Sequence, residues 1–202
     1  LWVTDGRAEL KDAAHLAELG ARTVEDTIRA EQGSDKIRVA QCGLAGMNRV
    51  RYANITNNLG HFNGRGGFGA LMGSKNLRAV AALGSGSLAY HDPEFLRNTA
   101  KAYAKTFREN TAGDALYVYG TTAFPAILSN VGALPVDNFR RSAVDDPTSI
   151  SGDTYTETLL KKRKGCHACP IMCKRVIENK DGPYRVDSRY GGPEYETIAG
   201  LG

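Results

Sequence analysis

The sequence lacks any apolar run close to the roughly 18 residues that a membrane-spanning helix requires, so we expect no membrane span. Its four cysteines, three of them tightly clustered, do not form the pattern of a disulfide framework for 202 residues. This usage favours a reducing compartment, which we take to be the cytoplasm, and thiols that bind metal. The chain opens on Leu1 with neither a start methionine nor a charged leader, and we interpret it as an internal part of a longer protein.

Acidic residues are missing from one long stretch. Residues 36–91 contain no Asp or Glu, although they carry Lys36, Arg38, Arg49, Arg51, Arg65, Lys75 and Arg78. In the middle of this stretch lies Gly64-Arg65-Gly66-Gly67-Phe68-Gly69. Glycines let the backbone approach an anion, consecutive N–H groups form an anion-binding nest, and Arg65 can add a charge-assisted contact. The stretch therefore predicts an anion site, whereas the net charge of +4 is too mild to indicate any partner.

Neither standard nucleotide-binding scheme fits this loop. Gly64, Gly66 and Gly69 match the dinucleotide fingerprint, but that motif needs an acidic residue about 20 residues further on, and none is present. Gly73-Ser74-Lys75 has the wrong residue order for a phosphate-binding Walker A loop. The alternative to an anion site is a set of tight turns with solvated arginines.

Three cysteines fall within the run Cys166-His167-Ala168-Cys169-Pro170-Ile171-Met172-Cys173. Closely spaced thiolates of this kind hold iron–sulfur clusters, with one more cysteine from elsewhere. A zinc site that includes His167 is the rival interpretation, and unbridged buried cysteines are a third. The flanking cations, Lys161 to Lys164 with Lys174 and Arg175, would raise a cluster's reduction potential. They could also be a solvated surface or a nucleic-acid patch, although the run has no aromatic residue for base stacking.

The residue patterns predict an α+β fold in two parts. The first part is strand-rich, with strands at 1–3, 37–40, 52–56 and 77–83, and with helices at 12–19 and from the N-cap Thr23 to Gly33. After Gly84-Ser85-Gly86-Ser87 the pattern becomes mainly helical, with helices at 92–108, 121–131, 154–164 and 193–199. We therefore expect two domains, spanning 1–86 and 87–202.

Four sequence blocks, in order, resemble the tungsten-dependent aldehyde:ferredoxin oxidoreductase family. They are residues 43–53, 64–77, 165–175 and 192–197. Weaker similarity, including residues 132–135 and 138–139, extends the resemblance over nearly the whole chain. It implies an N-terminal α/β domain and two helical domains that enclose a tungsten held by two pterins, with a [4Fe–4S] cluster beside one pterin that passes electrons to ferredoxin. Further pterin contacts, an active-site histidine and a fourth cysteine of the family are absent, so the chain resembles a fragment of a larger enzyme.

The resemblance also implies roles for individual residues. Three of them, Cys166, Cys169 and Cys173, are similar to cluster ligands, whereas Cys42 lies outside the motif and is not assigned as the fourth. The pterin phosphates would be contacted by Gly64 and Arg65. His61 and Phe62 stand where the family often has Arg and Ala, and the backbone carbonyl of Phe62 could still hold a magnesium ion that bridges the phosphates.

In the last block the family places a tyrosine and a glutamate near the tungsten, here Tyr195 and Glu196. A positioned carboxylate can orient the nucleophile and accept its proton during aldehyde oxidation. Glu194 is the alternative carboxylate, and the ordinary role of either is to complement a helix dipole.

The leading hypothesis is an oligomeric enzyme with a tungsten or molybdenum bis-pterin and a [4Fe–4S] cluster. It would oxidise aldehydes to carboxylic acids and reduce ferredoxin or an Fe–S subunit. The alternatives are a reductase of aromatic acyl-thioesters (benzoyl-CoA type) from the same family, and a zinc- or cluster-binding module that contacts nucleic acid through residues 161–175.

Overall fold

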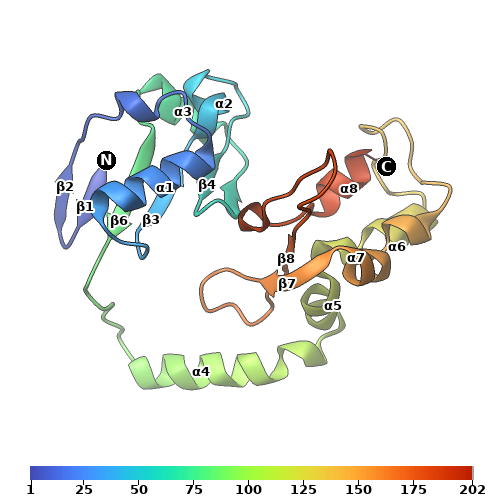
Figure 1. Cartoon of the computed structure of the whole chain (residues 1–202). Coiled ribbons are helices and arrows are strands. Elements are labelled where there is room, and N and C mark those ends of the chain that lie inside the picture. Colours follow the sequence, from blue (N-terminus) through green and yellow to red (C-terminus); the bar gives the residue numbers. More distant parts are fainter. Residues whose placement is uncertain (202) are drawn as a thin grey trace. The chain divides into compact units, whose positions relative to one another are not determined.

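The computed structural model describes residues 1–201. They form two compact units, Leu1–Ala89 and a second that begins at Tyr90 (Figure 1). Helices and sheets are combined in the chain, which confirms the mixed class that the residue patterns predict. No helix within residues 1–201 has the length and apolar character needed to cross a membrane.

The first unit is built on a six-stranded sheet in the order β2 (Arg7–Glu9), β1 (Trp2–Thr4), β6 (Ala79–Leu83), β3 (Arg38–Gln41), β4 (Ile55–Asn57) and β5 (His61–Asn63). Strands β1 and β6 pair in parallel, and all other neighbours are antiparallel. The short strand β5 forms one edge of the sheet, and the glycine-rich loop follows directly after it.

Helix α1 (Ala21–Gln32) supplies much of the core of this unit, where Val24 and Ile28 pack with Ile37 and Val39. The helix ends as predicted at Gly33, whose left-handed backbone (φ 70°) suits glycine. Its start was not predicted correctly, because it begins after Gly20 and Thr23 lies inside it.

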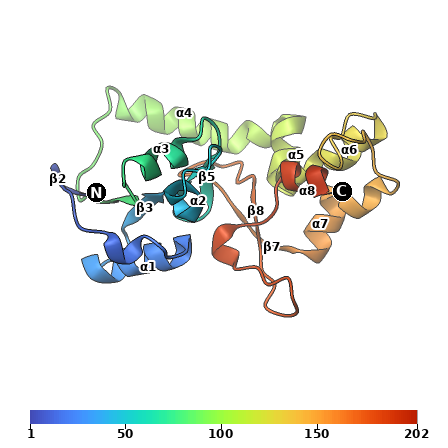
Figure 2. The ribbon, with the colours of Figure 1, turned by 90° about the horizontal axis from the view of Figure 1, so that it is seen from above.

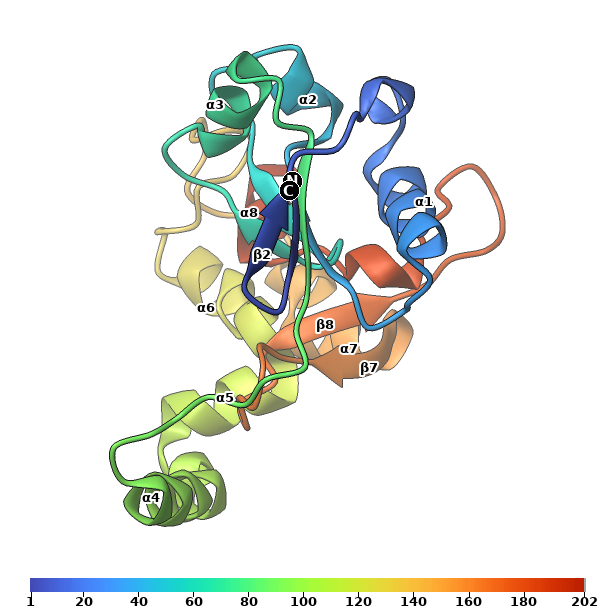
Figure 3. The same cartoon turned by 90° about the vertical axis from the view of Figure 1, so that its left-hand side faces the viewer.

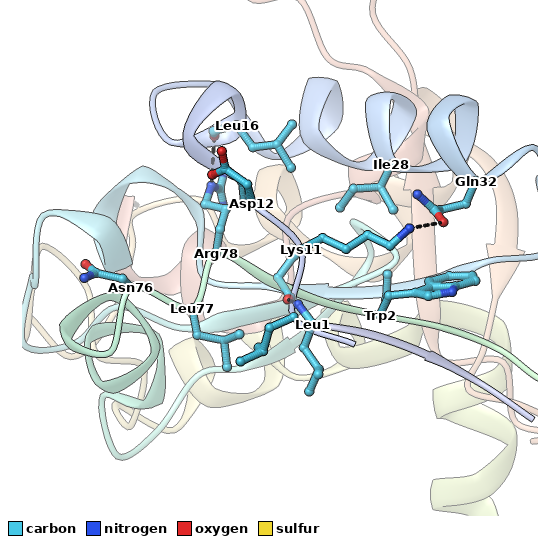
Figure 4. Close-up of a pocket in the computed structure, with 14 residues that line it drawn as sticks. Leu1, Trp2, Lys11, Asp12, Leu16, Ile28, Gln32, Asn76, Leu77 and Arg78 are labelled. Carbon is cyan, nitrogen blue, oxygen red and sulfur yellow. Dashed lines mark hydrogen bonds between the residues drawn. The ribbon is translucent and has the colours of Figure 1, made fainter. Parts of the chain in front are cut away.

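The helix predicted for residues 12–19 is only a 3₁₀ turn, η1 (Ala14–Leu16). The buried guanidinium of Arg78 donates hydrogen bonds to the carbonyls of Leu16 (3.2 Å) and Leu19 (2.9 Å). Carbonyls that a distant side chain satisfies have no need of an α-helical partner four residues on. Figure 4 shows Arg78 reaching the segment of Leu16 beside a small cavity of about 100 Å³.

Helices α2 (Gly43–Met47) and α3 (Phe68–Ser74) lie side by side next to this sheet (Figures 1 and 3). Glycine makes their close approach possible. A Cβ on Gly73 would lie 1.8 Å from the carbonyl oxygen of Gly46, and one on Gly46 would lie 2.6 Å from the carbonyl oxygen of Gly69. Backbone of α2 therefore packs on backbone of α3, the helix into which the glycine-rich loop leads.

The second unit is mainly helical. Its helices are α4 (Pro93–Thr106), α5 (Thr111–Tyr119), α6 (Pro125–Asn130), α7 (Gly152–Thr158) and α8 (Tyr195–Leu201), with 3₁₀ turns η2 (Phe107–Glu109), η3 (Gly120–Ala123), η4 (Pro147–Ile150) and η5 (Ser188–Tyr190). Helix α4 starts as predicted, because the Asp92 side chain accepts a hydrogen bond from the Phe95 N–H at 2.9 Å and Pro93 occupies the first turn.

Two helices predicted in this unit were wrong in extent. The one at 121–131 is divided into η3 and α6 at Pro125, which cannot donate a helical hydrogen bond. The one at 154–164 ends at Thr158, and residues after it form β7 (Leu160–Lys164), paired antiparallel with β8 (Lys174–Ile177). Pairing with β8, a strand further along the chain, determines this outcome, and residues 154–164 alone do not indicate it.

The core of the second unit includes Leu134, Val136 and Ala199, with Tyr195 packed against it. Helix α8 contacts α6 here, as Figures 1 and 2 show. The start of α8, which carries the predicted catalytic pair, is thereby anchored to the core.

Candidate functional site

The glycine-rich loop contains glycines of two physical kinds. Gly66 and Gly67 have left-handed backbones (φ 76° and 66°), and a Cβ on Gly67 would lie 2.2 Å from the carbonyl oxygen of Arg51. Both are needed to form the turn that leads into α3. Gly64 differs, since its backbone is not left-handed and a Cβ there would meet no heavy atom within 4 Å among residues 1–201. Nothing in the described chain explains a glycine at that position.

The other predicted cofactor-binding residues lie beside Gly64. His61 and Phe62 are on the edge strand β5, with His61 half-buried and Phe62 exposed, and Arg65 is exposed in the loop that follows. Arg51 is also exposed in this acid-free region. A cationic, glycine-rich rim at a sheet edge can bind an anion through N–H groups and arginine.

The three clustered cysteines lie in the loop of residues 165–173, which joins β7 to β8 and is called the cysteine loop below. None of the three forms a disulfide bond with a described residue; Cys166 is exposed, and Cys169 and Cys173 are half-buried. The loop is tightly folded, because the Cys169 N–H donates to the Cys166 carbonyl at 3.2 Å. Two of its non-glycine residues, Ala168 and Met172, have left-handed backbones (φ 56° and 49°).

Burial and neighbouring negative charges act on the pKa of the third cysteine, Cys173. Burial raises the pKa of the Cys173 thiol, and Glu194, Cys166 and Cys169 raise it further through their charges. The three thiols are therefore near enough to interact. No group of three or more His, Cys, Asp or Glu side chains in residues 1–201 is arranged to hold a single metal ion. A cubane cluster takes one thiolate per iron rather than several donors around one ion, so its chemistry fits three loop cysteines with a fourth from elsewhere.

The predicted catalytic pair lies at the start of α8. The Tyr195 N–H donates to the Thr121 hydroxyl oxygen at 3.0 Å, and that hydroxyl donates to the Glu194 carboxylate at 2.5 Å. The Glu194 carboxylate thus helps to fix the start of α8, whereas Glu196 is exposed. Tyr195 also lines an open cavity of about 570 Å³, with Leu134, Phe139, Arg140 and others.

Sequence reasoning missed a buried tyrosine next to this group. Tyr155 is 5% exposed, and its hydroxyl has no hydrogen-bond partner among the described residues. Burial, followed by the charge of Glu194, raises its pKa strongly. A Cβ on Gly192 would lie 2.2 Å from the Tyr155 hydroxyl, so glycine at that position makes room for the ring. The sequence contains no signal for Tyr155, because it lies mid-helix among polar residues.

Each unit thus gathers one set of predicted site residues. His61, Phe62, Gly64 and Arg65 are in the first unit, and the cysteines are with Tyr195 and Glu196 in the second. Within the second unit, Glu194 connects the cysteine loop electrostatically with the start of α8.

Comparison with known proteins points to a class of redox enzymes. Residues 1–84 match the family description "Aldehyde ferredoxin oxidoreductase, N-terminal domain", and residues 98–202 match "Aldehyde ferredoxin oxidoreductase, domains 2 & 3". The tungsten-containing aldehyde ferredoxin oxidoreductases of Pyrococcus furiosus and Thermococcus kodakarensis are each 36% identical over the whole chain. The chain belongs to the aldehyde ferredoxin oxidoreductase family, which is a family of enzymes.

Two further relatives show the breadth of the similarity. The WOR-like subunit of an aliphatic sulfonate oxidoreductase from Pyrococcus furiosus is 28% identical over the whole chain. The active-site complex BamBC of benzoyl coenzyme A reductase, solved with 1,5-dienoyl-CoA, matches 90% of this chain and 30% of its own with a TM-score of 0.65 and 26% identity. The chain spans about a third of the length of the curated aldehyde ferredoxin oxidoreductases that it matches.

Proposed function

We propose that the chain is part of an oxidoreductase with a tungsten bis-pterin and a [4Fe–4S] cluster, in which molybdenum is the alternative metal. The enzyme oxidises an aldehyde and water to a carboxylic acid, two protons and two electrons, and passes the electrons to ferredoxin or an Fe–S subunit. The names of the relatives that are 36% identical over the whole chain support this proposal.

The observation that carries the proposal is Gly64. Left-handed geometry or close packing accounts for Gly66, Gly67 and Gly69. Neither accounts for Gly64, where an added Cβ would contact no heavy atom of residues 1–201. Gly20, Gly84, Gly86 and Gly200 are equally open, so what distinguishes Gly64 is its place between the edge strand β5 and Arg65 in the acid-free loop. Glycine there lets the backbone approach an anionic ligand closely. With Arg65 beside it, this is a place for a pterin phosphate, and the carbonyl of Phe62 and the side chain of His61 would complete the contacts, including those to a bridging magnesium ion.

The cysteine loop supplies the cluster site in this proposal. Cys166, Cys169 and Cys173 hold three irons, and the fourth ligand comes from the remainder of the protein. When bound, the tungsten group supplies two-electron chemistry at the substrate and the cluster supplies one-electron transfer. We assign residues 1–86 to a pterin-binding domain and residues 87–202 to part of a helical domain that holds the cluster.

The carboxylate that we assign to catalysis is Glu196. Glu194 already accepts a hydrogen bond from Thr121 and so positions the start of α8, whereas Glu196 is exposed in the first turn of that helix. Glu196 orients the attacking water and accepts its proton. Tyr195 lies beside it and lines a cavity, whose size of about 570 Å³ is within the usual range for small-molecule sites.

Reduction of an aromatic acyl-thioester is the second candidate function. The match to the benzoyl coenzyme A reductase complex, with a TM-score of 0.65, favours it. Both candidates use the residues named above, and they differ in the direction of electron flow and in the substrate.

Elemental analysis and turnover of the full-length enzyme, purified without oxygen, test the proposal. We expect tungsten or molybdenum together with about four iron atoms per chain, and aldehyde-dependent reduction of a viologen dye. Reduction of benzoyl-CoA without aldehyde oxidation would select the second candidate. A protein that contains zinc, but neither iron nor tungsten nor molybdenum, would refute both.

A further inference from the structure

A buried cation, Arg175, lies on strand β8 just after the cysteine loop. Arg175, two residues after Cys173, is 1% exposed. Its guanidinium makes five hydrogen bonds, all to main-chain carbonyl oxygens. An arginine carries five N–H donors in a rigid planar fork and stays charged in proteins. Burial of this charge is costly unless such partners surround it.

Three of these carbonyls belong to the last turn of α5. Arg175 donates to Leu116 (3.3 Å), Tyr117 (3.1 Å) and Val118 (2.8 Å). The final carbonyls of a helix lack partners within the helix, and they form the negative end of its dipole. The guanidinium therefore caps this helix end, where the Leu116 carbonyl also accepts a hydrogen bond from the Gly120 N–H.

The other two carbonyls belong to the cysteine loop itself. Arg175 donates to Met172 (2.9 Å) and Cys173 (3.2 Å). Met172 has a left-handed backbone (φ 49°), which is unfavourable for a side-chain-bearing residue unless its surroundings hold it. The two bonds fix the peptide groups on both sides of the third cysteine, the first of which directly follows Met172, and so orient the thiol.

The neighbouring glycine shows how closely the parts fit. A Cβ on Gly120, at the end of α5, would lie 2.3 Å from the Cys173 carbonyl oxygen and 2.8 Å from the Arg175 Nε. Gly120 thus allows the helix end, the guanidinium and the loop to meet.

We propose that Arg175 is a positioning residue for the cluster ligand Cys173, and that its buried positive charge raises the reduction potential of the cluster. This inference rests on the proposed function, because it requires a cluster on the cysteine loop. Cluster potentials depend on local net charge, hydrogen bonding and exposure, and Arg175 contributes a desolvated charge that bulk water screens poorly.

The test is a redox titration of the full-length enzyme, followed by the electron paramagnetic resonance signal of the reduced cluster. We compare Arg175→Lys and Arg175→Gln with Lys162→Gln, a control that removes an exposed charge from the neighbouring strand β7. In Arg175→Gln we expect the equilibrium constant for one-electron reduction to fall about tenfold, which is about 59 mV. Arg175→Lys keeps the charge but lacks the planar guanidinium that bonds several carbonyls at once. The reduction potential of the cluster in this variant should stay near wild type, while its electron paramagnetic resonance signal broadens. Lys162→Gln changes neither.

Iron content separates the possible failures. Wild-type enzyme without iron would overturn the proposed function and this inference with it. Wild-type enzyme with iron, combined with an Arg175→Gln variant that keeps its iron, potential and signal, would overturn the inference alone. If Arg175→Gln does not fold, Arg175→Lys decides: a signal and potential identical to wild type would contradict the positioning role.

Discussion

Replacing Gly73 with alanine distinguishes helix propensity from packing, because the two effects have opposite signs. In an isolated helix the change would stabilise by about 1 kcal/mol. In α3 the new Cβ would lie 1.8 Å from the Gly46 carbonyl oxygen and 2.5 Å from its carbon, where ordinary contact begins at 3.4 Å. These are backbone atoms, so relief requires α2 and α3 to separate.

Overpacking typically costs about 1–3 kcal/mol, and a rigid backbone contact of this kind belongs at the upper end. We therefore expect a net loss of about 2 kcal/mol in the free energy of unfolding once the gain in propensity is subtracted. The thermal unfolding midpoint of the full-length protein, prepared without cofactor, should fall by about 1–2 °C.

Gly64→Ala is the matched control for this prediction. Its Cβ would meet nothing within 4 Å among residues 1–201, so the unfolding free energy should stay within about 0.5 kcal/mol of wild type. On the proposed function this variant nevertheless binds less tungsten, because the glycine faces the phosphate. A Gly73→Ala protein that unfolds at or above the wild-type temperature would refute the packing argument.

Two further predictions concern single carboxylates. Ser85 donates to the Asp5 carboxylate from its N–H (2.7 Å) and its hydroxyl (3.0 Å), which lowers the pKa of Asp5. A carboxylate whose pKa is lower in the folded than in the unfolded state stabilises the fold at pH values above its unfolded pKa, and this stabilisation is lost as the pH falls. The difference in thermal unfolding midpoint between wild type and Asp5→Asn should therefore shrink below about pH 4. A difference independent of pH would contradict the assignment. Glu196→Gln should reduce aldehyde turnover by about 100-fold or more with tungsten and iron retained, whereas the exposed Glu157→Gln should not. Unchanged turnover in Glu196→Gln would remove Glu196 from catalysis.

Features that depend on a few neighbouring residues were predictable from the sequence. The left-handed end of α1 at Gly33 and the start of α4 at Asp92-Pro93 follow from local backbone chemistry. The strand at 77–83 is visible as an apolar run, and β6 occupies Ala79–Leu83. The family itself was predictable because its motifs are contiguous blocks.

Features that depend on distant partners were not predictable. The segment 12–19 loses its helix to the guanidinium of Arg78, which lies far along the chain. The basic run after Thr158 becomes a strand because it pairs with residues beyond the cysteine loop. Within the site, Arg175 was one of six flanking cations until its burial and carbonyl partners distinguished it. Only the fold separates Gly64 from the glycines that packing requires.

The most direct test of the central claim, that the cysteine loop holds a cluster, is the iron content of Cys169→Ser beside that of Cys42→Ser in the full-length enzyme. Cys42 is buried in the first unit, where its thiol donates weakly to the carbonyls of Leu77 (3.7 Å) and Arg78 (3.8 Å). We predict that Cys169→Ser loses most of its iron but keeps its tungsten, and that Cys42→Ser keeps both. Full iron in Cys169→Ser, or loss of iron in a folded Cys42→Ser, would contradict the claim.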